Sequence, residues 1–245
     1  TTNHTFSFYA KNNGGDADVT MAFFVASQTQ SITLTNEWKR FEFTTSITSG
    51  NSVQVGVDNL TSIDMLIWGC QCEESYATSY IPTSGSTVTR NQDIFTRDGI
   101  GSLINSTEGV LFAEIAALSD DSVSRKISLN SGTFANQITV SYGSGGSNII
   151  QCIIYDGTNV VVNMSYSSTN ITDFNKIAIK YISGNTSLWV NGVEVDTDNA
   201  AFSGLSLSAL SFDNGSSTNF FYGKVKQLQV YNTALTDEQL TSLTS

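Results

Sequence analysis

Residues 188–195 read Leu-Trp-Val-Asn-Gly-Val-Glu-Val, two short apolar runs on either side of Asn191 and Gly192. An Asn-Gly pair adopts the positive φ angles of a tight turn with little strain, so this stretch predicts a β-hairpin. The pair Asp156 and Gly157 also lies between apolar, β-rich runs and predicts a second hairpin.

The turn at Asn191 determines which side chains of the first hairpin share a face. A two-residue turn pairs Trp189 with Glu194, and Leu188 with Val195. The aliphatic side chains then lie on one face of the hairpin, and Trp189 lies beside Glu194 on the other.

Other segments alternate apolar and polar residues with the period of a half-buried strand. Phe41 and Phe43 alternate with Arg40 and Glu42, and residues 177–181 also alternate. One sandwich takes roughly 100 residues, so a chain of 245 residues favours two. The predicted fold class is all-β, with two β-sandwich (jelly-roll) domains in tandem and a short C-terminal helix.

The helix is predicted from its N-terminal signals. Thr236 followed three residues later by Gln239 forms a capping box, and Leu235 with Leu240 forms a hydrophobic staple. Leu240 and Leu243 give the helix one apolar stripe, which predicts that it packs on a sandwich.

The domain boundary is predicted at Pro82, the only proline, within the polar and glycine-containing residues 80–87. The first domain is then residues 1–82, the linker 83–93 and the second domain 94–245. Because the chain begins with Thr1 instead of Met, we expect that it is a fragment or a processed product and that the first domain is N-terminally incomplete.

Composition excludes several classes of partner. The net charge of −11 disfavours binding to a phosphate backbone, so no nucleic acid is expected. No apolar run reaches the roughly 18 residues of a membrane-spanning helix, so no membrane insertion is expected. The three cysteines are predicted to be reduced and buried, because Cys70 and Cys72 are too close in sequence on one strand for an unstrained disulfide.

Two segments of the second domain resemble a known family. The hairpin 188–195 and the stretch from Gly223 to Gln239 resemble the signature hairpin, closing strand and terminal helix of concanavalin A-like, laminin-G-like jelly rolls. This resemblance covers residues 94–245 and implies a lectin-like fold, although one fold hosts many functions.

The first domain is similar to jelly-roll carbohydrate-binding modules in its segments 5–11, 37–43 and 67–73. The stretch from Ala77 to Arg90 looks like a connector of phage virion proteins of the fibre and appendage type. Together these resemblances imply a viral source and a role in glycan binding.

Catalytic constellations are sparse. Retaining glycosidases need two carboxylates about 5 Å apart, and the Glu-x-Asp-x-x-Glu strand of jelly-roll glucanases does not occur here. Glu114 stands alone on its predicted strand, and His4 is the only histidine available for an acid–base relay. The chain is therefore predicted to be no enzyme.

Carbohydrate-binding candidates lie on the two hairpins. Trp189 beside Glu194 offers a ring for the C–H groups of a sugar and a carboxylate for its hydroxyls. The alternative is that a loop, the first domain or another subunit covers Trp189. Tyr155 and Asp156 at the other hairpin tip are the second candidate, although the turn alone explains an Asp-Gly pair.

Two further sets of residues have competing interpretations. Trp38 and Trp68 of the first domain are expected in its core, with a sugar site as the alternative. Asp196 and Asp198 are expected to be solvated loop acids, with calcium ligation as the alternative. No cofactor is otherwise expected.

The function predicted from the sequence is a non-enzymatic phage virion appendage component, such as a fibre, spike or capsid-surface protein, with glycan-binding and host-adhesion activity. Its predicted partners are a cell-surface or environmental glycan, other virion proteins and further copies in a homo-oligomer. Its predicted location is the virion surface, after assembly in the host cytoplasm, and extracellular. The alternatives are a purely structural virion spacer or oligomerisation protein, and a carbohydrate-active enzyme or its binding module.

Overall fold

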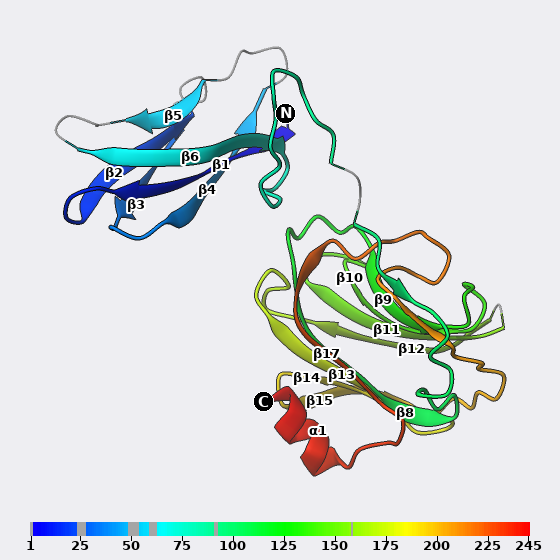
Figure 1. The fold of residues 1–245 in the computed structure, drawn as a ribbon. Coiled ribbons are helices and arrows are strands. Elements are labelled where there is room, and N and C mark those ends of the chain that lie inside the picture. The colour runs from blue at the N-terminus through cyan, green and yellow to red at the C-terminus, as the bar shows by residue number, and fades with distance from the viewer. Residues whose placement is uncertain (1, 24–27, 49–53, 59–62, 91–92, 158) are drawn as a thin grey trace. The chain divides into compact units, whose positions relative to one another are not determined.

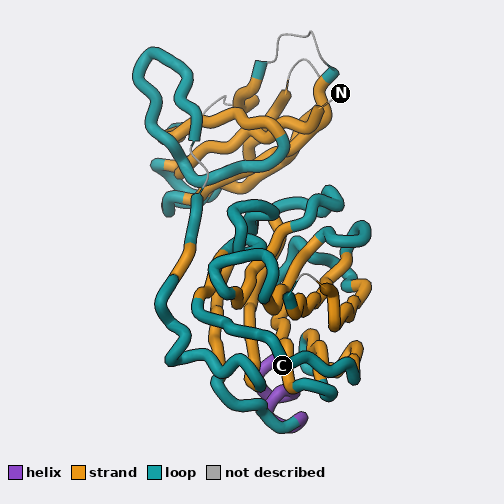
Figure 2. The backbone as a smooth tube through the Cα atoms, turned by 90° about the vertical axis from the view of Figure 1, so that its right-hand side faces the viewer, coloured by secondary structure: helices purple, strands orange, loops and turns teal. Residues whose placement is uncertain are grey.

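The computed structural model describes residues 2–23, 28–48, 54–58, 63–90, 93–157 and 159–245. The chain divides into two compact units, Thr1–Asn91 and Gln92–Ser245 (Figure 1). Asn91 and Gln92 of the predicted linker 83–93 lie outside the described residues. Strands dominate both units, and the one helix of the described residues is short, so the predicted all-β class is confirmed (Figure 2).

The first unit consists of two antiparallel three-stranded sheets with strand orders β4-β1-β6 and β3-β2-β5. The strands are β1 (Thr2–Asn12), β2 (Ala17–Phe23), β3 (Gln28–Leu34), β4 (Lys39–Ile47), β5 (Val55–Asp58) and β6 (Met65–Glu74).

Alternation along β1 and β4 builds the core of the first unit. Phe6 and Phe8 of β1 and Phe41 of β4 are buried, with ring centres 5.2 Å apart for Phe6 and Phe8 and 5.9 Å apart for Phe8 and Phe41. The polar residues between them lie on the opposite face of the sheet, as a period of two requires.

The second unit is a sandwich of a six-stranded and a five-stranded sheet, with orders β12-β11-β10-β9-β16-β7 and β15-β14-β13-β8-β17. Its strands are β7 (Thr96–Arg97), β8 (Glu108–Ala117), β9 (Arg125–Asn130), β10 (Gln137–Tyr142), β11 (Ile149–Asp156), β12 (Asn159–Ser167), β13 (Asn175–Ile182), β14 (Thr186–Val190), β15 (Val193–Asp198), β16 (Ala209–Ser211) and β17 (Gly223–Tyr231).

Aliphatic side chains from both sheets fill the core of the second unit. Two buried tyrosines keep their hydroxyls paired there, because an unpaired buried hydroxyl is costly. The Tyr142 hydroxyl donates to the Ile115 carbonyl at 2.8 Å, and the Tyr181 hydroxyl donates to the Asn105 carbonyl at 2.9 Å. Burial raises the pKa of both phenols.

The hairpin of β14 and β15 has the predicted turn, with φ angles of 49° at Asn191 and 86° at Gly192. Trp189 pairs with Glu194 as predicted, but Leu188 pairs with Asp196, so the predicted pairing of Leu188 with Val195 is wrong. A β-bulge causes the difference, since it inserts one extra residue into β15.

The helix α1 (Asp237–Thr244) packs on the outer face of the five-stranded sheet (Figure 1). Thr236 is its N-cap and forms the predicted capping box with Gln239. The Lys180 ammonium lies 3.0 Å from Asp237, and the Gly192 N–H donates to the Thr244 hydroxyl at 3.1 Å. Both ends of the helix are therefore attached to the sheet.

The cysteine prediction is correct for one residue and wrong for two. Cys152 is buried, whereas Cys70 and Cys72 are exposed, and all three are free. Both exposed thiols lie on β6, an edge strand of its sheet, where fewer neighbouring side chains cover them. In the part of the chain that the structure describes, no helix is long and apolar enough to cross a membrane.

Candidate functional site

Trp189 does not form an exposed sugar platform. It is 5% exposed and packs in one cluster with Phe112, Ala178 and Leu240, the last from α1. Its indole N–H donates to the Ser187 hydroxyl at 2.9 Å. The prediction of Trp189 as a glycan contact is wrong because the chain's own terminal helix covers the ring.

Glu194 loses its proposed partner as a consequence. It is exposed and remains in register with Trp189, but the ring beside it is under the helix. A carboxylate with no accessible ring next to it lacks the apolar half of a sugar site. The pair Trp189 and Glu194 is therefore no carbohydrate site in this structure.

Tyr155 occupies a different environment. It is half-buried at the end of β11, and its ring centre lies 4.5 Å from that of Phe134, which is 36% exposed. The Gln137 side-chain amide donates to the Phe134 carbonyl at 2.9 Å, and Gln137 is the register partner of Tyr155. The loop and the strand thus hold a partly exposed aromatic pair, which sequence analysis found only in part because Phe134 lies on another hairpin.

The Asp156 carboxylate is occupied by the backbone. Its Oδ2 atom accepts hydrogen bonds from the N–H groups of Ser203 at 2.8 Å and Gly204 at 3.0 Å. Asp156 therefore anchors the loop at residues 203–204 and supports the position of Tyr155 instead of presenting a free acceptor.

Asp196 and Asp198 of β15 bridge the two sheets of the second unit. Asp196 accepts from the N–H of Ser165 at 2.9 Å, and Asp198 accepts from the N–H of Asn163 at 3.3 Å, both on β12. They satisfy donors of an edge strand, so the expectation of merely solvated loop acids is wrong. Calcium at this pair stays a prediction, and it would compete with these hydrogen bonds.

Trp38 and Trp68 of the first unit are exposed, at 50% and 53% of their surface, so the prediction that they belong to the core is wrong. Trp68 lies on β6 in contact with the rings of Tyr9 and Tyr80, with ring centres 5.3 and 4.5 Å away. The prediction relied on the general preference of aromatic side chains for a sandwich core, and that preference does not show which face of β6 is outward.

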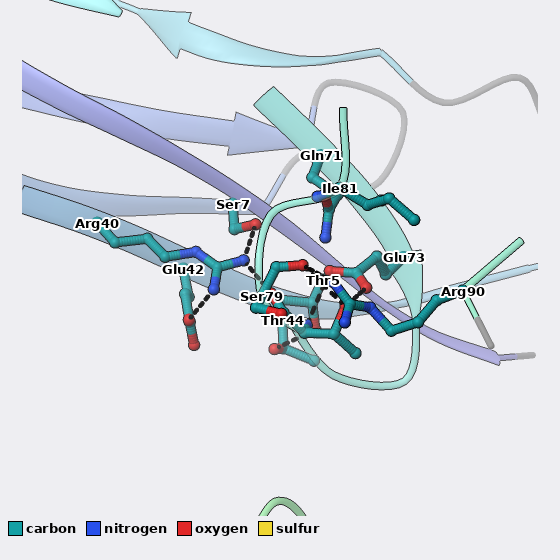
Figure 3. Close-up of polar contacts among 11 residues, drawn as sticks. Thr5, Ser7, Arg40, Glu42, Thr44, Gln71, Glu73, Ser79, Ile81 and Arg90 are labelled. Atoms are coloured by element: carbon teal, nitrogen blue, oxygen red, sulfur yellow. Dashed lines mark hydrogen bonds and ion pairs between the residues drawn. The ribbon is translucent and has the colours of Figure 1, made fainter. Parts of the chain in front are cut away.

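The segment that carries Tyr80 lies over the outer face of the sheet β4-β1-β6 and is held by side chains of the sheet (Figure 3). The Arg40 guanidinium donates to the Thr78 carbonyl at 2.5 Å and to the Ser7 hydroxyl at 2.9 Å. The Glu73 carboxylate accepts from the Thr78 N–H at 3.0 Å and from its hydroxyl at 2.5 Å.

Two further contacts extend this attachment along the segment (Figure 3). The Gln71 side-chain carbonyl accepts from the Ile81 N–H at 3.0 Å, and the Arg90 guanidinium donates to the Ser79 carbonyl at 2.6 Å. The bonds made by Arg40, Glu73 and Arg90 are charge-assisted and so among the stronger ones, which attaches the segment to the first unit.

Comparison with known proteins identifies the family of the second unit. A family profile described as the concanavalin A-like lectin/glucanases superfamily matches residues 111–241, slightly more than half of the chain. The chain belongs to the concanavalin A-like lectin/glucanase superfamily. The resemblance of the second domain to these lectins is thereby confirmed, and the unit is called the lectin domain below. Among curated protein sequences, none matches the chain.

Solved structures similar to the chain include carbohydrate-binding domains. The CBM40 domain of the Ruminococcus gnavus IT-sialidase, solved with α2,3-sialyllactose, is 15% identical with a TM-score of 0.47, and the match covers 58% of this chain and 84% of that one. Domain 4 of the arabinanase AbnA of Geobacillus stearothermophilus, solved with arabinotriose, is 16% identical with a TM-score of 0.47, covering 63% and 82%.

A third similar structure is the leech intramolecular trans-sialidase, at 17% identity and a TM-score of 0.45, covering 57% of this chain and 23% of that protein. The chain thus spans less than a quarter of the leech enzyme. Similarity to these structures does not identify a ligand for this chain, so a binding site has to be found among the chain's own side chains.

Glu114 of the lectin domain is buried and paired instead of facing a second carboxylate. Its Oε1 atom lies 2.6 Å from the Lys226 ammonium on the neighbouring strand β17. Across the described ranges, the structure brings together no group of three or more His, Cys, Asp or Glu side chains that could hold a metal ion.

A buried arginine pairs with a carboxylate in the lectin domain. Arg125 is 2% exposed, and its guanidinium lies 2.5 Å from the Asp121 carboxylate. Partial burial alone would raise the pKa of Asp121, but hydrogen bonds from Arg125, the Val123 N–H and the Ser119 hydroxyl outweigh it and lower the pKa.

We expect Asp121→Asn to destabilise the lectin domain by about 1–2 kcal/mol near neutral pH, a value reduced because the carboxylate is partly exposed. Since the folded-state pKa is depressed, this stabilisation is present above the unfolded pKa of about 3.9 and is lost as the pH falls through the folded value. Thermal unfolding of wild type and variant at pH 7 and at steps below pH 4 measures the difference. A difference that stays constant down to the lowest pH would contradict the assignment.

Proposed function

We propose that the chain is a non-enzymatic, glycan-binding component of a phage virion appendage, and that its lectin domain contacts the glycan at Phe134 and Tyr155. The observation that carries the proposal is this partly exposed aromatic pair on a domain of the lectin superfamily. Two rings at the tips of adjoining hairpins offer apolar faces to the C–H groups of a sugar.

The surroundings of the pair support a binding site. Asp156 and Gln137 hold the loop and strand on either side of Tyr155, so the rings are positioned before a ligand arrives. A positioned ring loses less conformational freedom on binding than a mobile one, which favours affinity.

The proposed virion role rests on the resemblance of residues 77–90 to connectors of phage fibre and appendage proteins. It implies a location on the virion surface after assembly in the host cytoplasm, with other virion proteins and further copies of the chain as partners. Mass spectrometry of purified virus particles tests the location, and light scattering of the intact chain tests the oligomer. A monomeric mass would count against the oligomer.

A second candidate function is a structural spacer without sugar binding. The observation that favours it is the burial of Trp189 under α1, together with the use of Asp156, Asp196 and Asp198 as backbone acceptors. Several groups that a lectin could present to a sugar are here parts of the fold.

A glycan array probed with the intact chain separates the two functions. Under the proposal, wild type binds at least one glycan, and Tyr155→Ala lowers the affinity about tenfold, as the loss of one stacked ring predicts. Tyr222→Ala is the matched control, because Tyr222 is a comparably exposed tyrosine elsewhere in the lectin domain, at 37%. The absence of binding to every glycan would favour the spacer, and unchanged binding in Tyr155→Ala would exclude this site.

A further inference from the structure

The outer face of the sheet β4-β1-β6 carries aromatic and basic side chains in adjacent rows. Strand register places Arg40, Tyr9 and Trp68 side by side across the three strands. The next residue on the same face of β1 is Lys11, whose Nζ lies 5.6 Å from the centre of the Trp38 ring. We define the Trp68 surface as Tyr9, Lys11, Trp38, Arg40, Trp68 and Tyr80.

Both tryptophans of this surface are half exposed, although a tryptophan buries more apolar area than almost any other side chain when it can. Neither belongs to the buried cluster that forms the core of the first unit. The core therefore does not account for them, and exposed aromatic rings in a group point to an interaction.

Trp68 is held in one orientation. Its ring contacts the rings of Tyr9 and Tyr80, and the next residue, Gly69, has a φ of 67°. A Cβ atom at Gly69 would lie 3.2 Å from Tyr80 and 3.3 Å from Tyr9, so glycine lets the two rings close on Trp68. The segment that carries Tyr80 is itself bonded to Arg40 and Glu73 of the sheet (Figure 3).

The charges around the rings select the ligand. The whole chain has a net charge of −11, and its first unit has only four Lys or Arg residues, of which Lys11 and Arg40 lie in the Trp68 surface. Arg40 is already bonded to Ser7 and Thr78 and lies 3.7 Å from Glu42, which leaves Lys11 as the cation beside an exposed ring. The carboxylates on the same face are engaged as well, because Glu42 lies beside Arg40 and Glu73 accepts from Thr78. Lys11 therefore offers an anionic ligand a cation on an otherwise acidic protein.

We infer that the Trp68 surface is a second glycan site, selective for a polysaccharide that carries carboxylate groups. Trp38 and Trp68 stack on the C–H faces of sugar rings, and Lys11 pairs with a carboxylate of the polymer. This site extends the proposed glycan binding to the first unit and rests on it for the class of ligand alone, since it shares no residue with the pair Phe134 and Tyr155.

The polar composition of the surface favours a glycan over a protein partner. Its aromatic rings are interspersed with Lys11 and Arg40, and the adjoining floor holds Ser7 and Gln71. Leu66, the register partner of Lys11, adds one exposed aliphatic side chain to this face, at 42%. One aliphatic side chain among aromatic and charged ones does not form the continuous aliphatic patch that a second copy of the chain would bury.

The test uses the intact chain and carboxylate-bearing probes, namely hexamers of galacturonate, guluronate and α2,8-linked sialic acid. For a probe that binds, its methyl ester is the uncharged match. The inference predicts binding to at least one acidic hexamer, weaker binding to its ester, and loss of affinity as salt rises, because salt screens the contact with Lys11.

Variants assign the binding to residues. Trp68→Ala and Trp38→Ala are each expected to lower the affinity about tenfold, and Lys11→Gln by a few-fold to tenfold. Lys39→Gln is the matched control for charge, since Lys39 pairs with the core-facing Ala10 and thus lies on the opposite face of the sheet. Tyr155→Ala leaves this binding unchanged, which separates the two sites.

A measurement on wild type does not depend on the folding of any variant. Acrylamide quenches exposed tryptophans, and Trp189 is buried, so most quenching comes from Trp38 and Trp68. A bound acidic hexamer protects both rings and lowers the quenching.

Three outcomes would overturn the inference. They are no binding to any acidic hexamer, binding that Tyr155→Ala removes and Trp68→Ala does not, and a lower oligomeric mass in Trp38→Ala or Trp68→Ala without an effect on glycan binding. The second outcome would leave the proposed function standing at Tyr155, whereas the third would make the Trp68 surface an interface between copies.

Discussion

Trp189→Ala is expected to destabilise the lectin domain by about 3–5 kcal/mol, the cost of removing a large buried aromatic side chain and leaving a cavity. The ring is 5% exposed and packs against β8, β13 and α1 through Phe112, Ala178 and Leu240. The substitution also leaves the Ser187 hydroxyl without its indole donor. Scanning calorimetry of the intact chain measures the change as a lower unfolding temperature of one unit.

Trp189→Phe is the matched control for this prediction. Phenylalanine keeps an aromatic ring in the cluster. The substitution removes less side-chain volume than Trp189→Ala does, together with the indole N–H, so we expect a cost of about 1–2 kcal/mol. A Trp189→Ala protein with wild-type stability and no glycan binding would reverse the conclusion, because that result is expected of an exposed sugar platform.

Leu240→Ala is expected to cost about 2–5 kcal/mol, the range for truncating a fully buried leucine. Leu240 projects from α1 onto the outer face of the five-stranded sheet, where it is 0% exposed. Its loss loosens the cover over Trp189. In a Trp38→Phe, Trp68→Phe background, where Trp189 is the one remaining tryptophan, acrylamide should therefore quench the fluorescence more strongly when Leu240 is replaced by Ala.

Thr236→Ala is the control for a change in the helix that leaves its apolar contact intact. It removes the N-cap hydrogen bond to Gln239 and is expected to cost only about 1 kcal/mol. The effects of Leu240→Ala and Trp189→Ala should sum to more than that of the double variant, because both residues belong to one cluster. A Leu240→Ala cost as small as that of Thr236→Ala would show that the helix does not cover the sheet in solution.

Local sequence determined the features of this protein that depend on neighbouring residues. The Asn191 and Gly192 turn, the capping box of Thr236 and Gln239, and the all-β class all follow from residues close together in the chain. Turn and cap preferences act over a few residues, so tertiary contacts have little scope to override them.

Tertiary structure alone decided which aromatic side chains are accessible. Alternation correctly placed Trp189 on the face opposite the aliphatic core, but the helix that covers this face lies 48 positions further along the chain at its first residue, Asp237. Trp68 was predicted to be buried but is exposed, because the rings of Tyr9 and Tyr80 contact it and leave half of its surface uncovered.

The bulge in β15 is a second feature that local sequence did not predict and that the folded structure decided. It moves the partner of Leu188 from Val195 to Asp196 and gives Asp196 and Asp198 positions from which they accept hydrogen bonds of β12. An alternating pattern assumes one residue opposite one residue on the partner strand, whereas a bulge places two residues opposite one. The pattern therefore cannot reveal a bulge.

Exposure is decided by packing between distant segments. For this reason the sequence indicated Tyr155 but not its partner Phe134, and only the folded chain showed that Trp38 and Trp68 are exposed.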